Sequence, residues 1–350
     1  IELWIKDGFE KYKIVFSGDV GNIDQPIINN PTYITEADYV VMESTYGNRL
    51  HLENSLSKLD QLSLAIKESL GRGGNLIIPA FAIERTQDLL YNLNLLVQKK
   101  EVLPEQIYVD SPLAIQATEI FCENTSYYDE EAKEFINDNT CPLMLPGFQF
   151  TRTSEESMEL NKIKSGAIII SASGMCDAGR IKHHLKHNLW RNESTILFVG
   201  YQAQGTLGRK ILDGEKIVRI HGEEVAVKAQ IRKIEGYSAH ADQAGLLKWA
   251  TSFKVPPQKF FIVHGEEDSS NVLARLLQQE YPQTAIHIPS LYEEFLLSRE
   301  EETIKIINDL VQAKSIHGKL DAFISEQIQK GNYRSLQKIL LQIEQLISKN

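Results

Sequence analysis

Two histidines stand at the ends of two short apolar runs in the second half of this chain. His240 lies in Ser-Ala-His-Ala-Asp at 238–242, and His264 directly follows Phe-Phe-Ile-Val at 260–263, with an amphipathic, helix-like run between them. Runs of four or more apolar or β-branched residues predict buried strands, and ligands bind beyond the carboxyl ends of strands in open α/β sheets. We therefore expect both side chains at one edge of one sheet; the alternative is two unrelated histidines that cap strands.

The same pattern occurs twice near the start of the chain. The apolar run 12–16 leads into Ser-Gly-Asp-Val-Gly at 17–21, and the run 37–42 leads into Glu-Ser-Thr-Tyr-Gly at 43–47. Each of four strand ends thus delivers one metal-binding or proton-transferring side chain, namely Asp19, Glu43, His240 and His264. A mixed set of carboxylates and histidines suits zinc or a similar ion, and two metals bridged by a carboxylate suit phosphodiester hydrolysis.

These four motifs resemble, in order and at plausible gaps, the late motifs of the metallo-β-lactamase-fold nucleases over residues 12–290. More narrowly, they resemble the β-CASP branch, which includes the cleavage-and-polyadenylation endonuclease and its bacterial and archaeal relatives. The resemblance implies an α/β chain: a partial metallo-β-lactamase αββα fold with an inserted β-CASP domain built on a doubly wound parallel sheet. It also implies a zinc-dependent endo- or exoribonuclease that hydrolyses single-stranded RNA held between the two domains.

The resemblance also implies roles for the four residues. The acid that matches Asp19 bridges two zinc ions, and the histidine that matches His264 binds one of them. Glu43 and His240 match a proton-transfer pair, in which the carboxylate fixes the imidazole tautomer and raises its pKa. His240 would then protonate the leaving 3′ oxygen while a hydroxide on the metal attacks phosphorus. As alternatives, Asp19 would occupy an ordinary β-turn and His264 a buried core position. Glu43 and His240 would merely cap a turn and a helix, and Asp242 competes with Glu43 for orienting His240.

The cluster that supplies most zinc ligands in this family, H-x-H-x-D-H, does not occur in these 350 residues, and neither does a further histidine expected before Asp19. Either the N-terminal part that carries them is missing from this sequence or the chain is a degenerate member; the intact late motifs favour the first interpretation. We expect this chain alone to hold an incomplete site for the two zinc ions and to be inactive. The rival functions are a non-catalytic RNA-binding or scaffolding relative of the same fold and a metallo-hydrolase with a small substrate.

Between the two acids and the two histidines, short apolar runs alternate with helix-like segments such as 81–99. This alternation implies a parallel, doubly wound sheet with helices on both faces. We place the β-CASP domain at 48–206 and the metallo-β-lactamase domain at 1–47 and 207–298. Residues 299–350 are expected to form a helical C-terminal extension, either an appendage packed on the domain or a homodimer contact. Its apolar residues at helical spacing are Ile304, Ile307, Leu310, Val311, Leu336, Ile339, Leu340 and Ile343.

Candidate substrate contacts follow two kinds of signal. The turn at 171–175 lies between a buried run and a helix, where backbone N–H groups can hold a phosphate; its candidates are Ser171, Ser173, Gly174 and Met175. The next helix carries the densest basic patch of the chain, where we expect either an RNA backbone or an ordinary solvated helix face; its candidates are Arg180 and His184. Further candidates for phosphate contacts, each just after a strand end or a glycine turn, are Arg49, Arg85 and Arg209.

Bulk properties narrow the class of protein. The 350 residues suffice for two domains, and the net charge of −10 argues against a non-specific nucleic-acid coat, although divalent cations supply a positive field of their own. No apolar run approaches the roughly 20 residues of a membrane helix, and the first residues do not resemble a signal peptide, so we expect no membrane contact. The widely spaced Cys122, Cys141 and Cys176 are interpreted as ordinary thiols of a cytoplasmic protein.

Overall fold

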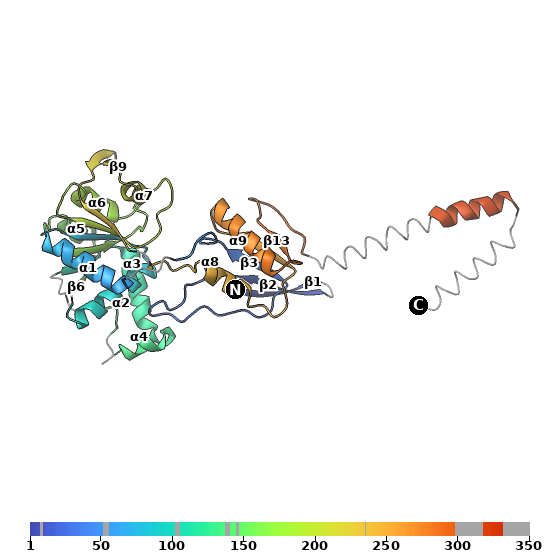
Figure 1. Ribbon diagram of the computed structural model, residues 1–350, viewed down its shortest axis with the longest axis horizontal. Coiled ribbons are helices and arrows are strands. Elements are labelled where there is room, and N and C mark those ends of the chain that lie inside the picture. The colour runs from blue at the N-terminus through green and yellow to red at the C-terminus, as the bar shows by residue number, and fades with distance from the viewer. Residues whose placement is uncertain are drawn as a thin grey trace. The chain divides into compact units, whose positions relative to one another are not determined.

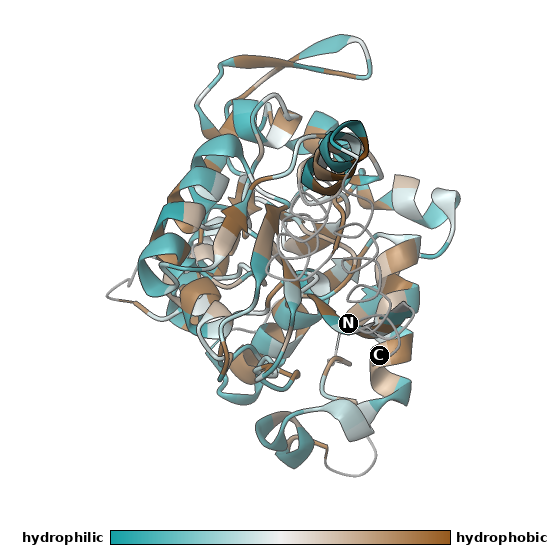
Figure 2. Cartoon of the chain, turned by 90° about the vertical axis from the view of Figure 1, so that its right-hand side faces the viewer, coloured by the Kyte–Doolittle hydropathy of each residue, from teal (hydrophilic) through white to brown (hydrophobic). Residues whose placement is uncertain are grey.

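The structure is a computed structural model that describes residues 1–7, 10–51, 56–101, 106–136, 141–144, 147–234, 236–297 and 318–331. The chain divides into two compact units, Ile1–Pro289 and Ser290–Asn350. The larger unit holds two extended sheets in two lobes (Figure 1). Apolar residues concentrate on the central strands, whereas polar residues line the outward faces of many helices (Figure 2).

The first lobe is built on a five-stranded sheet in the order β1-β2-β3-β12-β13. The β1–β2 pair is antiparallel and the other pairs are parallel. Two helices pack into one core with this sheet through Leu246, Trp249 and Leu273. The elements are β1 (Glu2–Asp7), β2 (Glu10–Phe16), β3 (Tyr39–Glu43), β12 (Lys259–Val263), β13 (Ala285–His287), α8 (Gln243–Ala250) and α9 (Glu267–Glu280).

The second lobe is built on a six-stranded sheet in the order β11-β8-β4-β7-β5-β6, in which every pair is parallel. The strands are β4 (Leu76–Pro79), β5 (Gln106–Val109), β6 (Phe148–Phe150), β7 (Ala167–Ser171), β8 (Thr195–Phe198) and β11 (Gln230–Lys233). Alternate residues of β4, such as Leu76 and Ile77, enter two different apolar cores, one on each face of the sheet. The expected doubly wound parallel sheet is therefore confirmed.

Helices cover both faces of this sheet. On one face lie α1 (Lys58–Gly71), α2 (Arg85–Gln98), α3 (Pro112–Glu123) and α4 (Glu130–Glu134), with η1 (Thr125–Tyr127) between the last two in sequence. The other face is covered by α6 (Ile181–Asn188), α7 (Leu207–Leu212) and the hairpin of β9 (Ile217–Ile220) and β10 (Glu223–Ala226), while α5 (Ser154–Leu160) contributes Leu160. Because both faces are buried, the strands are apolar almost throughout.

One domain boundary differs from the expected position. We expected the chain to return to the first domain at residue 207, but α7, the β9–β10 hairpin and β11 all pack with the second sheet. The reason is the pairing of β11 with β8, with Gln230 opposite Thr195 and Lys233 opposite Phe198. The division into domains stays a proposal, with the second crossing now near residue 234.

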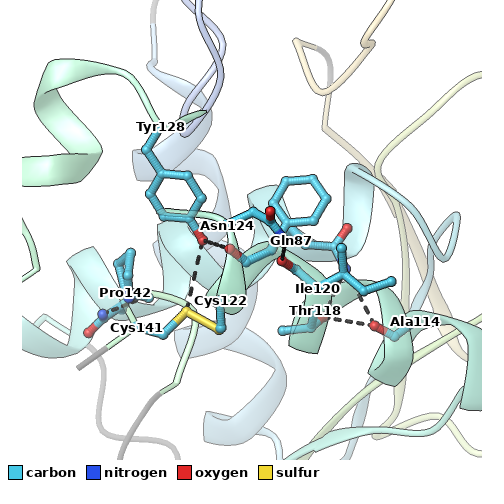
Figure 3. Close-up of a disulfide and its surroundings, with 11 residues drawn as sticks. Gln87, Ala114, Thr118, Ile120, Cys122, Asn124, Tyr128, Cys141 and Pro142 are labelled. Carbon is cyan, nitrogen blue, oxygen red and sulfur yellow. Dashed lines mark hydrogen bonds between the residues drawn. A yellow bond between two sulfur atoms is a disulfide. The ribbon is translucent and has the colours of Figure 1, made fainter. Parts of the chain in front are cut away.

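Cys122 and Cys141 form a disulfide, contrary to the expected free thiols (Figure 3). The last turn of α3 and the segment 141–144 bring their Cα atoms to 5.4 Å, and the Tyr128 hydroxyl lies 3.9 Å from the Cys141 Sγ. Their separation of 19 residues resembles no disulfide framework, so tertiary packing alone reveals the pair. Cys176 is free and buried, and burial raises the pKa of its thiol.

In the smaller unit the structure describes residues 318–331, of which 318–329 are helical. The apolar positions expected between Ile304 and Ile343 lie outside the described residues. Among the described helices, none combines the length and apolar character that a bilayer crossing requires.

Replacing both cysteines of the disulfide, as Cys122→Ser with Cys141→Ser, should lower the free energy of unfolding by about 3 kcal/mol, because an open loop of about 20 residues regains chain entropy in the unfolded state. Urea denaturation measures the change. A reductant should destabilise the wild type by the same amount and leave the double variant unchanged; equal stability of the two proteins without reductant would contradict the bond.

Candidate active site

The carboxyl ends of neighbouring strands bring the four predicted residues to one edge of the first sheet. β2, β3 and β12 run parallel and adjacent, so Asp19, Glu43 and His264 follow or end neighbouring strands. His240 was expected at a strand end of this sheet, but it follows β11 of the second sheet and joins the other three residues through a bridge between its own backbone and Gly21. Backbone hydrogen bonds on either side fix this bridge, from Asn22 N–H to the Ala239 carbonyl and from Ala241 N–H to the Val20 carbonyl, each 2.7 Å long.

Asp19 and His264 face each other across 3.2 Å, measured between the carboxylate Oδ1 and the imidazole Nδ1. Both side chains are more than half exposed, at 65% and 60%. Two ligands that each lie about 2.0–2.1 Å from a tetrahedral zinc ion are roughly 3.3 Å apart. The spacing and the chemistry of this donor pair therefore fit zinc, and neither residue occupies a buried core position.

Glu43 and His240 form a hydrogen-bonded pair beside these donors. Both carboxylate oxygens of the buried Glu43 lie 3.1 Å from His240 Nδ1. The same carboxylate accepts the backbone N–H groups of Val20 at 2.6 Å and Thr45 at 3.2 Å. The hydrogen bond that His240 donates to Glu43 raises the pKa of His240, and burial opposes this shift. Since Nδ1 is engaged, the other ring nitrogen, Nε2, is directed toward Asp19 Oδ2 at 4.0 Å.

Asp242, the expected competitor for His240, has other partners. One carboxylate oxygen accepts the N–H of Gly245 and so caps α8, and the other accepts the N–H of His51. Glu43 therefore orients His240, while also accepting the N–H of Thr45 as an ordinary turn-capping residue would.

A cleft of about 1130 Å³ opens over these residues. Its floor includes Asp19, His240 and His264 from the first lobe. Its opposite wall comes from the carboxyl edge of the second sheet and includes Glu84, Arg85, Met175 and Tyr201. The site thus lies between the two sheets of one compact unit, a position typical of ligand sites.

Two family models match the chain. A Beta-Casp domain matches residues 86–211, and a Zn-dependent metallo-hydrolase RNA specificity domain matches residues 224–289. Ribonuclease TTHA0252 of Thermus thermophilus is 35% identical over 264 residues, which are 75% of this chain and 60% of the relative. An RNase J-like protein of Methanocaldococcus jannaschii is 31% identical over 74% of this chain and 59% of its own length. Transcription termination factor FttA of Methanosarcina mazei is 26% identical over 77% and 43%.

The chain belongs to the β-CASP branch of the metallo-β-lactamase fold. The expected family and fold class are thereby confirmed. The chain spans about three fifths or less of the length of these curated relatives. The second family description implies a metal-dependent site, and among the described residues Asp19, Glu43 and His240 form a group whose ligand atoms lie within 4.8 Å of one another.

The predicted substrate contacts of this β-CASP chain divide into two sets. Arg49 lies in the cleft with its guanidinium over the rings of Tyr46 at 4.5 Å and Tyr201 at 4.9 Å. Met175 also lines the cleft, next to Gly174, whose carbonyl accepts a hydrogen bond from Gln202. These residues stay candidates for RNA contacts.

The other predicted contacts are engaged inside the second lobe. Arg180 and the fully buried His184 both bind the buried carboxylate of Asp110, at 2.7 and 2.6 Å. Ser171 donates to the Asp110 carbonyl at 2.7 Å, and Ser157 donates to the Asp110 carboxylate at 2.6 Å. His184 therefore has no surface for a substrate, because its imidazole belongs to a buried ionic network.

Three further candidates have local partners. The Ser173 hydroxyl bonds to Ala178 within its own turn. Arg85 is buried and donates to the Val199 carbonyl, so it supports the cleft wall. Arg209 pairs with Asp213 on an exposed face of α7.

Sequence reasoning missed two cleft residues, Tyr201 and Glu84. Tyr201 follows the end of β8 and donates to the Glu266 carboxylate at 2.6 Å, which links the second lobe to the first. His264 was predicted because it directly follows an apolar, strand-like run, and the same reasoning would have identified Tyr201. Glu84 lies on the loop after β4, and its only signal in the sequence is this position.

Zinc binding by residues 1–350 should be weak and incomplete. Few donors converge among the described residues, and the Glu43 oxygens are already engaged in hydrogen bonds. Metal analysis after dialysis against zinc should find fewer than two tightly bound ions per chain. Asp19→Ala should reduce the bound zinc further, whereas Asp213→Ala, a matched change on α7, should not. Two fully occupied ions with four protein ligands each would contradict this expectation.

The pKa of His240 should depend on Glu43. Because the carboxylate stabilises imidazolium, the pKa in the wild type lies above its ordinary value of 6.5, and Glu43→Gln should lower it. The pair's contribution to stability is complete below the ordinary pKa and is lost as the pH rises through the raised value. NMR titration of the metal-free chain measures both values, with Glu155→Gln, an exposed change on α5, as a control. An unchanged pKa in Glu43→Gln would show that the hydrogen bond is absent in solution.

Proposed function

We propose that the complete protein is a metal-dependent ribonuclease that hydrolyses phosphodiester bonds of single-stranded RNA in the cleft between the two lobes. The proposal is supported by three side chains on the floor of that cleft, Asp19, His240 and His264, and by the buried Glu43 that is hydrogen-bonded to His240. RNA as the substrate is favoured by the names of two relatives, a ribonuclease and an RNase J-like protein, and by the RNA specificity domain matched at 224–289.

Asp19 and His264 would hold zinc, because their donors have the spacing and chemistry that zinc requires. When bound, zinc supplies Lewis acidity that activates water and stabilises charge on the phosphate. The chain itself supplies the proton transfer. Glu43 accepts a hydrogen bond from His240 Nδ1–H and so stabilises the imidazolium form, which also carries a proton on Nε2. This Nε2–H faces the cleft and can be donated to the leaving 3′ oxygen, after which the ring is neutral.

The cleft offers stacking surfaces as well as charge. The Arg49 guanidinium packs on Tyr46 and Tyr201 within the cavity. Aromatic faces and arginine bind single-stranded nucleic acid without demanding one base sequence. Met175 extends the wall on the same side. This combination suits a flexible single strand better than a small substrate.

In the complete protein, His240→Ala should lower kcat for RNA cleavage by about 10²–10⁴-fold with little change in KM, because it removes a proton donor used in the transition state. Asp19→Ala and His264→Ala should abolish cleavage through loss of metal. His187→Ala, an exposed histidine on α6, is the matched control and should retain activity.

Steady-state kinetics on a labelled RNA oligomer, together with metal analysis, check these outcomes. Undiminished cleavage by Asp19→Ala or His264→Ala would refute the proposal. RNA binding without cleavage by the wild type loaded with zinc would favour a scaffolding protein instead.

A further inference from the structure

Glu84 occupies a strained turn at the cleft wall. The helix expected from residue 81 begins only at Arg85, because a γ-turn precedes it: Arg85 N–H donates to the Ile83 carbonyl at 2.8 Å. Glu84 is the central residue, with φ 67° and ψ −61°. Such a turn with positive central φ is rare and costs conformational energy for a residue with a side chain. Although Glu84 stands at the N-cap of α2, its side chain makes no capping hydrogen bond.

The turn places a carboxylate over the reaction site. Glu84 is half-buried and lines the cleft opposite the floor that carries Asp19 and His240, and it interacts electrostatically with both. Burial raises the pKa of this carboxyl, whereas the charges of Arg85 and His240 lower it. Among the described residues that line the cleft from the second lobe, Glu84 is the only acid.

The other two acids of the cleft are already engaged. Asp19 faces His264 and His240, and Glu266 accepts the hydroxyl of Tyr201. No hydrogen bond reaches the Glu84 carboxylate from the part of the chain that the structure describes. A partly desolvated carboxylate without a donor is costly, so a bound substrate that supplies a donor here gains affinity.

The chemistry of an RNA strand limits what this donor is. Phosphate oxygens are repelled by an unpaired carboxylate such as that of Glu84, so they would lie on the opposite side, where Asp19 and His264 would hold zinc. The ribose 2′-hydroxyl is the donor that always accompanies a phosphate in RNA and is missing from DNA. A base amino group would be available only in some RNA sequences, whereas the residues on the floor of the site would contact only the RNA backbone.

We propose that Glu84 is a specificity-determining residue, whose carboxylate accepts a hydrogen bond from the 2′-hydroxyl of the nucleotide beside the scissile phosphate. This inference rests on the proposed ribonuclease function. The proposed contact with the 2′-hydroxyl explains why a strained turn places a carboxylate in a cleft that would bind a polyanionic substrate.

The test couples a protein change to a substrate change in the complete protein. The substrates are an RNA oligomer, the same oligomer with one 2′-deoxynucleotide at the cleaved position, and the DNA of the same sequence. Glu84→Gly suits the positive φ and so keeps the fold, and Glu84→Gln keeps an accepting oxygen without charge. Glu155→Gln, on exposed α5, controls for the loss of one charge.

The wild type should cleave RNA with a kcat/KM about tenfold or more above that for the deoxy-substituted oligomer, as expected for one hydrogen bond to a charged group. In Glu84→Gly this ratio of kcat/KM values should fall to about one to three. The ratio for Glu84→Gln should lie between those of the wild type and Glu84→Gly, and Glu155→Gln should keep the ratio of the wild type. A general change in charge moves both rates together and leaves the ratio intact. An unchanged ratio in Glu84→Gly overturns the inference.

Binding separates this failure from failure of the proposed function. Fluorescence anisotropy gives the Kd values of RNA and DNA for wild type and Glu84→Gly. A wild type that cleaves nothing but prefers RNA, with the preference lost in Glu84→Gly, refutes the nuclease and supports the contact. Equal binding of RNA and DNA by an inactive wild type overturns both.

Discussion

The in-register parallel pairing of β3 with β12 is the constraint on which the site depends. Glu43 pairs with Val263, and beyond the strands the Ser44 N–H still donates to the His264 carbonyl at 3.1 Å. Gly265 allows this close approach, since a methyl group there would lie 2.3 Å from the Ser44 hydroxyl. A slip of one residue would turn Glu43 to the opposite face of the sheet. The acid and the histidine therefore reach the same edge because the two backbones advance in step.

The second lobe holds the remaining catalytic candidate in place. Tyr237 is fully buried in the core of the six-stranded sheet, where Asn92 donates to its hydroxyl at 3.2 Å. Three residues later, His240 contacts Glu43 in the first lobe. The backbone therefore passes from the core of the second lobe at Tyr237 directly to the candidate active site at His240. The hydrogen bond from Tyr201 to Glu266 is a second link. Since both links are short, a change in the orientation of the lobes would also displace the imidazole.

Sequence periodicity predicted the strands and the doubly wound sheet, and the position of Asp19, Glu43 and His264 after parallel strands predicted their convergence. His240 converges with them for another reason, because it follows β11 of the second sheet and reaches the site through its backbone bridge to Gly21. The sequence-based predictions failed where the position of a residue depends on a partner that is far away in the sequence. The hairpin and strand at 217–233 carry no sign of which sheet they join. Arg180 and His184 resemble a basic surface until Asp110, more than 70 residues earlier for His184, is placed beneath them. The turn at Glu84 contains no glycine, so the sequence does not indicate the positive φ of this residue.

The acidic charge of the chain shapes how it can bind RNA. Much of the basic segment around α6 is already engaged, since Arg180 pairs with Asp110, His184 is hydrogen-bonded to the same carboxylate and Lys186 pairs with Glu223. Arg49 packs on two aromatic rings and pairs with no carboxylate in the described part of the chain. With a net charge of −10, long-range attraction contributes little beyond what bound metal supplies. Affinity must therefore come from contacts made inside the cleft. Stacking and a sugar contact act only at short range, so a cleft of this kind selects its substrate after entry rather than by attraction from a distance.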